Sequence, residues 1–213
     1  MTAGTASATS TTPTTIDRSD FRHILVSGTK VGVAMAGAVI VFLAVSRLVP
    51  AGTVRALLQT IVVLAAGVAA SLLPAYWATA RTTQGIASAA AIGLWGTIVF
   101  MAIDIILLRP FHAFPWTWDA IGGGSTWWYL PIWWMLGTFV AWMGGLVTAG
   151  RAAPGGAGDV SIQALALPLV IGAAVLALAV ALLRLGIYLP VAAGAGFTLV
   201  LTVFAVVAIA RKT

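Results

Sequence analysis

Residues 85–108 read GIASAAAIGLWGTIVFMAIDIILL, an apolar run whose single charged side chain is Asp104. A helix rises about 1.5 Å per residue, and about 20 apolar residues cross the hydrocarbon core of a bilayer. Five further runs of this kind occur in the chain. The sequence therefore predicts an all-α integral membrane protein, a six-helix transmembrane bundle over 31–211 with spans at approximately 31–49, 55–79, 85–108, 127–149, 162–183 and 187–210.

The overall composition supports the same class of protein. Hydrophobic residues make up 61% of the 213 residues, charged residues make up 8%, and the mean hydropathy is +1.08. Soluble domains carry about 25% charged residues, so a bilayer is the solvent that matches this chain. The 11 lysines and arginines are scattered at the ends of the apolar runs and form no basic stripe, which argues against nucleic-acid binding.

The reactive residue types are too few for most catalytic or metal sites. The chain has no cysteine, and its two histidines, His23 and His112, lie far apart and outside the expected spans. Disulfides, thiolate catalysis, iron–sulfur clusters and a haem held by two histidines are therefore excluded. Intramembrane aspartyl chemistry needs two aspartates, and only Asp104 is available. We expect no enzyme activity, no catalytic residue, no metal and no cofactor.

The N-terminal residues differ from the rest of the chain. Residues 1–16, MTAGTASATSTTPTTI, carry no charge and no hydrophobic periodicity, which predicts a disordered tail. Residues 17–30 place Phe21, Ile24 and Leu25 on one side of a helix. They are expected to form a separate, interfacial amphipathic segment before the first span.

The basic residues also predict the orientation of the bundle. With the N-terminus inside, the cytoplasmic segments hold seven of them and the outer segments hold four, which favours cytoplasmic positions for both termini in a multi-pass inner (cytoplasmic) membrane protein. The segment 109–126 then lies on the outer face, as an interfacial aromatic loop between the third and fourth helices. The seven are Arg18, Arg22, Lys30, Arg81, Arg151, Arg211 and Lys212; the four are Arg47, Arg55, Arg109 and Arg184.

Asp104 is a carboxylate at the end of a membrane-spanning run, where a charge is costly. It shares one helical face with a stripe of small residues, Gly85, Ala89, Gly93 and Thr97. Small residues allow another helix to approach closely, so Asp104 is expected to face protein rather than lipid. Two interpretations remain. The favoured one is a structural ion pair near the outer boundary; the other is a proton- or cation-binding carboxylate in a transport path. The candidate partners are Arg109, Arg47 and Arg184.

The segment after Asp104 is the most aromatic part of the chain, since six of the nine tryptophans lie between 116 and 134. Tryptophan favours the headgroup layer, so interfacial anchoring explains part of this pattern. The alternative is a surface that contacts a partner subunit, a lipid or a pigment. The candidate contact residues are His112, Trp116, Trp118, Asp119, Trp127, Trp128, Trp133 and Trp134.

Two functions fit these observations. The first is a non-catalytic scaffold or accessory subunit, which would contact the lipid bilayer and other membrane subunits, or further copies of itself, through the Trp-rich surface. The alternative is a small-solute transporter or substrate-capture component that uses Asp104 and the aromatic loop 109–128. A polar cavity beside Asp104 would favour transport, and a dry, packed interface would favour the scaffold.

Overall fold

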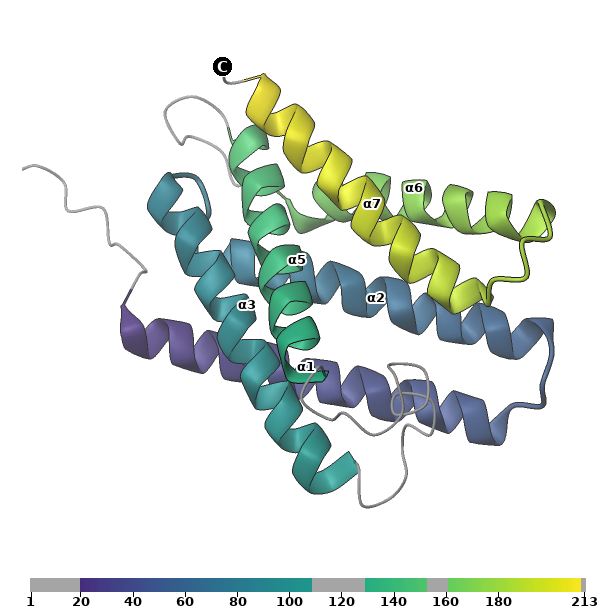
Figure 1. The fold of residues 1–213 in the computed structure, drawn as a ribbon. Helices are drawn as coiled ribbons and strands as arrows, with labels where there is room; N and C mark the ends of the chain where they lie inside the picture. Colours follow the sequence, from purple (N-terminus) through teal and green to yellow (C-terminus); the bar gives the residue numbers. More distant parts are fainter. Residues whose placement is uncertain (1–19, 109–128, 153–160, 212–213) are drawn as a thin grey trace, which may run out of the picture.

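The structure of the chain is a computed structural model that describes residues 20–108, 129–152 and 161–211 (Figure 1). The expected tail 1–16 lies outside the described residues, and so does the expected aromatic loop 109–128. All regular elements in the described ranges are helical. They are α1 (Phe21–Leu48), α2 (Thr53–Trp77), α3 (Thr83–Ile103), the π-helical turn η1 (Asp104–Leu108), α5 (Tyr129–Arg151), α6 (Ile162–Leu182) and α7 (Leu189–Ala210).

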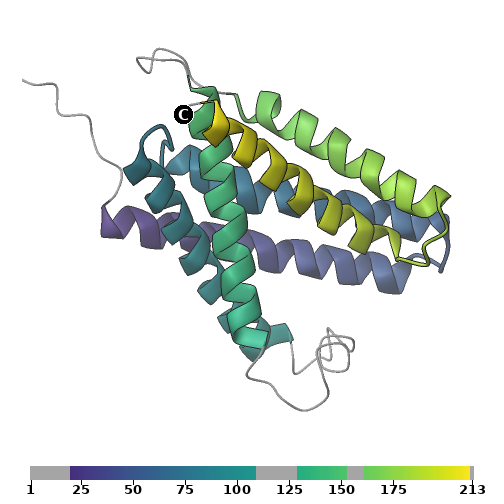
Figure 2. The same ribbon diagram turned by 45° about the horizontal axis from the view of Figure 1, so that its top comes forward.

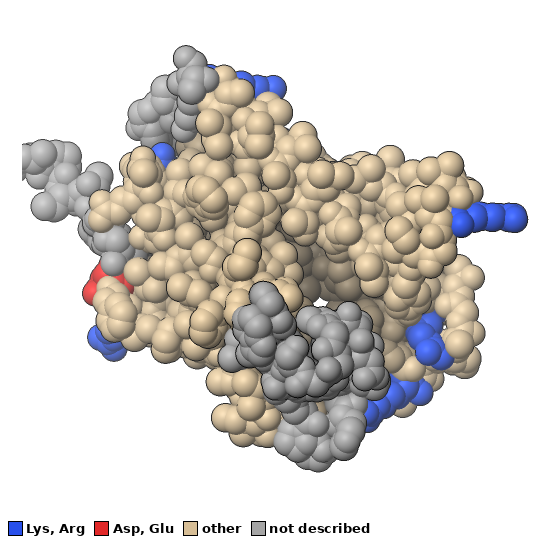
Figure 3. Space-filling model, in the orientation of Figure 1, with Lys and Arg blue, Asp and Glu red and all other residues tan. Residues whose placement is uncertain are grey.

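Six of the described helices are long and apolar enough to cross a membrane, with α3 and η1 forming one of them, Thr83–Leu108. The predicted fold class, an all-α six-helix bundle, is confirmed. Basic side chains lie at the edges of the molecule in Figure 3, and a broad uncharged surface lies between them. The chain is a polytopic membrane protein whose helices contact the bilayer.

The first helix is longer than the expected span 31–49. It begins at Phe21 and continues without a break through residues that we expected to form a separate interfacial segment. No proline interrupts this stretch, and Ser27 and Gly28 are buried against the rest of the bundle. At Gly28 a Cβ atom would lie 2.8 Å from the Trp95 ring, so this part of α1 packs directly on α3.

The helices are not all parallel to one axis. Figures 1 and 2 show α1 beside α2 and α6 beside α7, whereas α3 and α5 lie together and cross the other helices at a steep inclination. Helix α5 packs against three other helices, α3, α2 and α7. It therefore connects the α1–α2 half of the bundle to the α6–α7 hairpin.

Small residues allow α5 to approach its neighbours closely. A Cβ atom at Gly144 would overlap the backbone carbonyl oxygen of Ser71 on α2, and one at Gly137 would overlap the Thr97 side chain on α3. The hydroxyl groups at these crossings are satisfied within their own helices. Ser71 Oγ donates to the Gly67 carbonyl at 2.8 Å, and Thr97 Oγ1 donates to the Gly93 carbonyl at 2.9 Å. The crossings are thus made by backbone contact and dispersion.

Replacing Gly144 by alanine is expected to destabilise the bundle by about 1–3 kcal/mol, because the added methyl group overpacks the α5–α2 crossing. Gly37 in α1 provides the matched control, since a Cβ atom there would meet nothing within 4 Å. Gly37→Ala should be neutral or stabilising by up to about 1 kcal/mol, through helix propensity alone. Unfolding in mixed detergent micelles, followed by circular dichroism, measures both; equal stabilities would contradict the packing described.

Candidate functional site

Asp104 lies on the buried side of its helix. It is the first residue of η1, which continues α3 toward the end of the span, and only 1% of its surface is exposed. Its neighbours one turn away on the same face, Phe100 and Leu108, are also buried. The stripe of small residues on α3, from Gly85 to Thr97, is buried along its length. The carboxylate therefore faces the protein rather than the lipid.

Apolar side chains pack closely around this end of α3. Phe100 and Met101 form a buried cluster with Ala36 of α1, and Trp133 of α5 packs against that cluster. The rings of Phe100 and Trp133 meet edge to face, with centroids 5.8 Å apart and planes 61° apart. This geometry is favourable for aromatic pairs and adds to the burial of both rings. The described part of this region is a packed interface.

The structure does not bring two of the candidate arginines to Asp104. Arg47 in the last turn of α1 and Arg184 after α6 are both exposed, and neither forms an ion pair within the described residues. Figures 1 and 2 show why: the ends of α1 and α6 lie away from the end of the steeply inclined α3. Arg109 lies outside the described residues.

Most of the predicted aromatic contact residues cannot be placed, because His112, Trp116, Trp118, Asp119, Trp127 and Trp128 lie outside the described residues. The remaining two are in α5. Trp133 is half-buried against Phe100, whereas Trp134 and the following residue, Met135, are exposed. The two tryptophans thus have different surroundings although they are adjacent in sequence.

A further tryptophan on α5, which the sequence did not single out as a contact residue, is exposed at an unusual depth. Trp142 lies close to the middle of the 21-residue span Pro131–Arg151, and 46% of its surface is exposed. Its indole N–H makes no hydrogen bond within the described residues. The sequence could have indicated this residue, because Trp142 lies away from both ends of its span, whereas anchoring tryptophans lie near span ends.

A polar network near the ends of α1 and α2 was also missed. Gln59 of α2 is 2% exposed, and its Nε2 donates to Ser46 Oγ of α1 at 2.6 Å. The hydroxyl of Tyr188, just before α7, donates to the other atom of the same amide, Oε1. Ser46 Oγ in turn donates to the Phe42 carbonyl at 2.8 Å. One buried amide thereby joins α1, α2 and the segment before α7.

His23 belongs to the first turn of α1, not to a region outside the spans as the sequence suggested. Its Nε2 lies 3.1 Å from the Trp77 carbonyl oxygen at the end of α2, within hydrogen-bond distance. The Lys30 ammonium lies 5.9 Å from the centre of the Trp77 ring, a cation–π distance. Within the described ranges, no group of three His, Cys, Asp or Glu residues is placed to hold a metal ion.

Comparison of the chain with known protein families, with curated proteins and with solved structures finds no match. The fold and the described site therefore establish only a class of protein. The chain is a polytopic membrane protein whose six helices are packed through small and apolar side chains.

Tyr188→Phe is expected to lower the stability by about 1 kcal/mol, because it removes the donor to the buried Gln59 amide. Tyr76→Phe is the matched control: the Tyr76 hydroxyl makes no hydrogen bond within the described residues, and its loss should change stability by less than about 0.5 kcal/mol. Thermal unfolding in detergent, followed by far-ultraviolet circular dichroism, compares the two. Equal effects would show that the network does not hold the three segments together.

Proposed function

We propose that this chain is a non-catalytic scaffold or accessory subunit of a larger membrane complex, located in the inner (cytoplasmic) membrane with both termini in the cytoplasm. Its contact surface is Trp-rich and includes the exposed side of α5. Two features support the proposal: an apolar, closely packed interior in the described helices, and exposed aromatic side chains on α5.

Trp142 is the observation that carries the proposal. Interfacial anchoring places tryptophan at the headgroups, about half a span away from this residue. At mid-depth there is no water to accept a hydrogen bond from the indole N–H, and an unsatisfied donor in hydrocarbon is costly. A neighbouring membrane helix can supply both an acceptor and a well-packed surface for the ring.

The rest of the exposed side of α5 suits the same partner. Met135 lies two turns before Trp142 on nearly the same face, and it is 71% exposed. Methionine is unbranched and flexible, so it adapts to irregular packing partners. Together these two side chains offer a large, adaptable apolar surface without a charge. A hydrophobic transmembrane helix of another subunit, or of a second copy, is the partner that this surface fits.

Transport is the second candidate, and one feature of Asp104 favours it. The carboxylate begins a π-helical turn, η1, and π-helical turns are frequent at functional sites. In this alternative, Asp104 binds a proton or a cation during uptake of a small solute, together with the aromatic loop. The apolar cluster of Phe100, Met101 and Trp133 beside this end of α3 supports the scaffold instead.

Purification of the full chain from its native membrane in mild detergent should yield an assembly heavier than one chain, with a stoichiometric partner. Trp142→Ala and Met135→Ala should reduce recovery of the partner several-fold and leave the melting temperature of the chain unchanged. Leu178→Ala, at an exposed position of α6, is the matched control and should have no effect on recovery. Native mass spectrometry gives the composition; a lone monomer would contradict the proposal.

Because the chain has no cysteine, the contact can also be mapped directly. A single Met135→Cys substitution, alkylated with a thiol-specific photo-cross-linking reagent, should cross-link to the partner on illumination in membranes, whereas Val175→Cys on the exposed side of α6 should not. Equal cross-linking at both positions would indicate random collision in the bilayer instead of a specific contact at α5.

Asp104→Asn separates the two candidate functions. Under the scaffold proposal, the variant should assemble with its partner, and proteoliposomes of either protein should show no voltage-driven proton or cation flux above that of empty liposomes. Under the transport alternative, the wild-type protein conducts or couples such a flux, and the neutral side chain abolishes it while the protein still folds. A trapped pH-sensitive dye measures the proton flux, and a flux that depends on Asp104 would overturn the scaffold proposal.

A further inference from the structure

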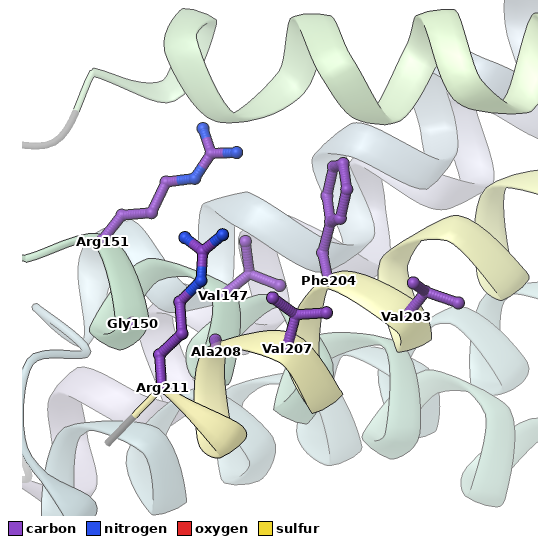
Figure 4. Close-up of a pocket in the computed structure, with 8 residues that line it drawn as sticks. All are labelled: Val147, Gly150, Arg151, Val203, Phe204, Val207, Ala208 and Arg211. Atoms are coloured by element: carbon purple, nitrogen blue, oxygen red, sulfur yellow. The ribbon is translucent and has the colours of Figure 1, made fainter. Parts of the chain in front are cut away.

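A pocket of about 170 Å³ opens between α5 and α7, at the end of the bundle where both helices terminate. Two arginines border it, Arg151 in the last turn of α5 and Arg211 directly after α7. Figure 4 shows both guanidinium groups extending into the same space, with the Phe204 ring at its other side. The charge distribution of the sequence predicts that this end is cytoplasmic.

The two helices cross closely beneath the arginines. A Cβ atom at Gly150 would overlap the Ala208 side chain, so the backbones of α5 and α7 are nearly in contact there. This close crossing brings together two residues that are 60 positions apart in the sequence. The positions of Arg151 and Arg211 relative to each other therefore depend on packed helix backbones and not on loops.

The two guanidinium groups differ in how much of their hydrogen-bonding capacity the protein uses. Arg151 donates one bond, from Nη1 to the Ala164 carbonyl at 3.1 Å, and its Cζ lies 5.8 Å from the centre of the Phe204 ring. The side chain of Arg211 makes no hydrogen bond or ion pair within the described residues. A guanidinium has five N–H donors, and the described residues leave several of them available to an anion in the pocket.

The walls below the arginines are apolar and open to the surrounding lipid. Val203 and Val207 precede Arg211 at intervals of four residues, which places all three on one helical face. Both valines are exposed, and they line the pocket. The site thus presents positive charge at the membrane boundary and, directly beneath it, a strip of exposed hydrocarbon.

From this arrangement we infer that the pocket binds one anionic phospholipid, with its headgroup phosphate between Arg151 and Arg211 and an acyl chain along Val207 and Val203. Guanidinium groups bind phosphate through paired, charge-assisted hydrogen bonds. Basic pockets between transmembrane helices on the cytoplasmic side are suited to anionic headgroups. Attraction of an arginine to its own helix C-terminus accounts for a basic residue there, but not for two guanidinium groups from different helices at one apolar pocket.

The test is titration of the purified full chain, in neutral detergent, with phosphatidylglycerol and phosphatidylcholine of identical acyl chains, read by native mass spectrometry. Wild-type protein should bind phosphatidylglycerol at least about tenfold more tightly. Arg211→Gln should reduce that affinity about tenfold and leave phosphatidylcholine binding unchanged, because one charged donor set is lost. Arg184→Gln, an exposed arginine at the opposite end of the bundle, is the matched control and should bind as the wild type does.

Arg211→Gln is the decisive variant, because the Arg211 side chain makes no hydrogen bond or ion pair within the described residues. The fold should therefore survive the substitution. Arg151→Gln also removes the bond to Ala164, so its melting temperature must be measured beside its lipid affinity. Equal affinity of the wild type and Arg211→Gln for phosphatidylglycerol would overturn the inference. Equal affinity of the wild type for the two lipids would do so as well. Full displacement by millimolar inorganic phosphate would assign the site to a free anion and would likewise refute the lipid.

Discussion

The close approach of α5 to the backbones of α2 and α3 is the contact on which the rest of this bundle depends. Apolar side chains gain little by leaving a hydrocarbon solvent, so helices in a bilayer associate through dispersion at short range and through hydrogen bonds. The absence of a side chain at Gly144 lets the Ser71 carbonyl approach α5, and Gly137 does the same for Thr97. The steep inclination of α3 and α5 in Figure 1 accompanies these crossings.

Hydrogen bonds add to these backbone contacts, and several hydroxyl groups in the helices have a local partner. The hydroxyls of Ser71 and Thr97 donate to carbonyls of their own helices, so they need no acceptor on the neighbouring helix. Gln59 differs from these hydroxyl groups, because its amide bonds to both α1 and the segment before α7. A side chain with one donor group and one acceptor can join two further segments, and in a low-dielectric setting such bonds keep their geometry.

The fold class could be predicted from the sequence because it depends on the length and composition of each apolar run, which are local properties. The burial of Asp104 on the small-residue side of α3 follows from helical periodicity for the same reason. The separation of Asp104 from Arg47 and Arg184 could not be predicted, since it depends on how far α3 tilts from its neighbours. The Gln59 network could not be predicted either. Packing of α1, α2 and the segment before α7 brings Ser46 and Tyr188 to Gln59, and the spacing of these residues in the sequence does not indicate it.

The described tryptophans show that the depth of a residue in the membrane decides where its indole N–H can find a hydrogen-bond acceptor. Trp77, at the end of α2, has its carbonyl bonded by His23 and its ring under Lys30, as suits a span end near water. Trp95 lies deeper but donates its N–H to Thr29 Oγ1 at 3.1 Å, so the bundle satisfies it internally. Trp142 lies at mid-depth, is exposed, and has no such acceptor in the described residues. Hydrocarbon cannot supply an acceptor either. The requirement that is met within the chain at Trp95 is therefore the physical reason why the scaffold proposal places a partner protein at Trp142.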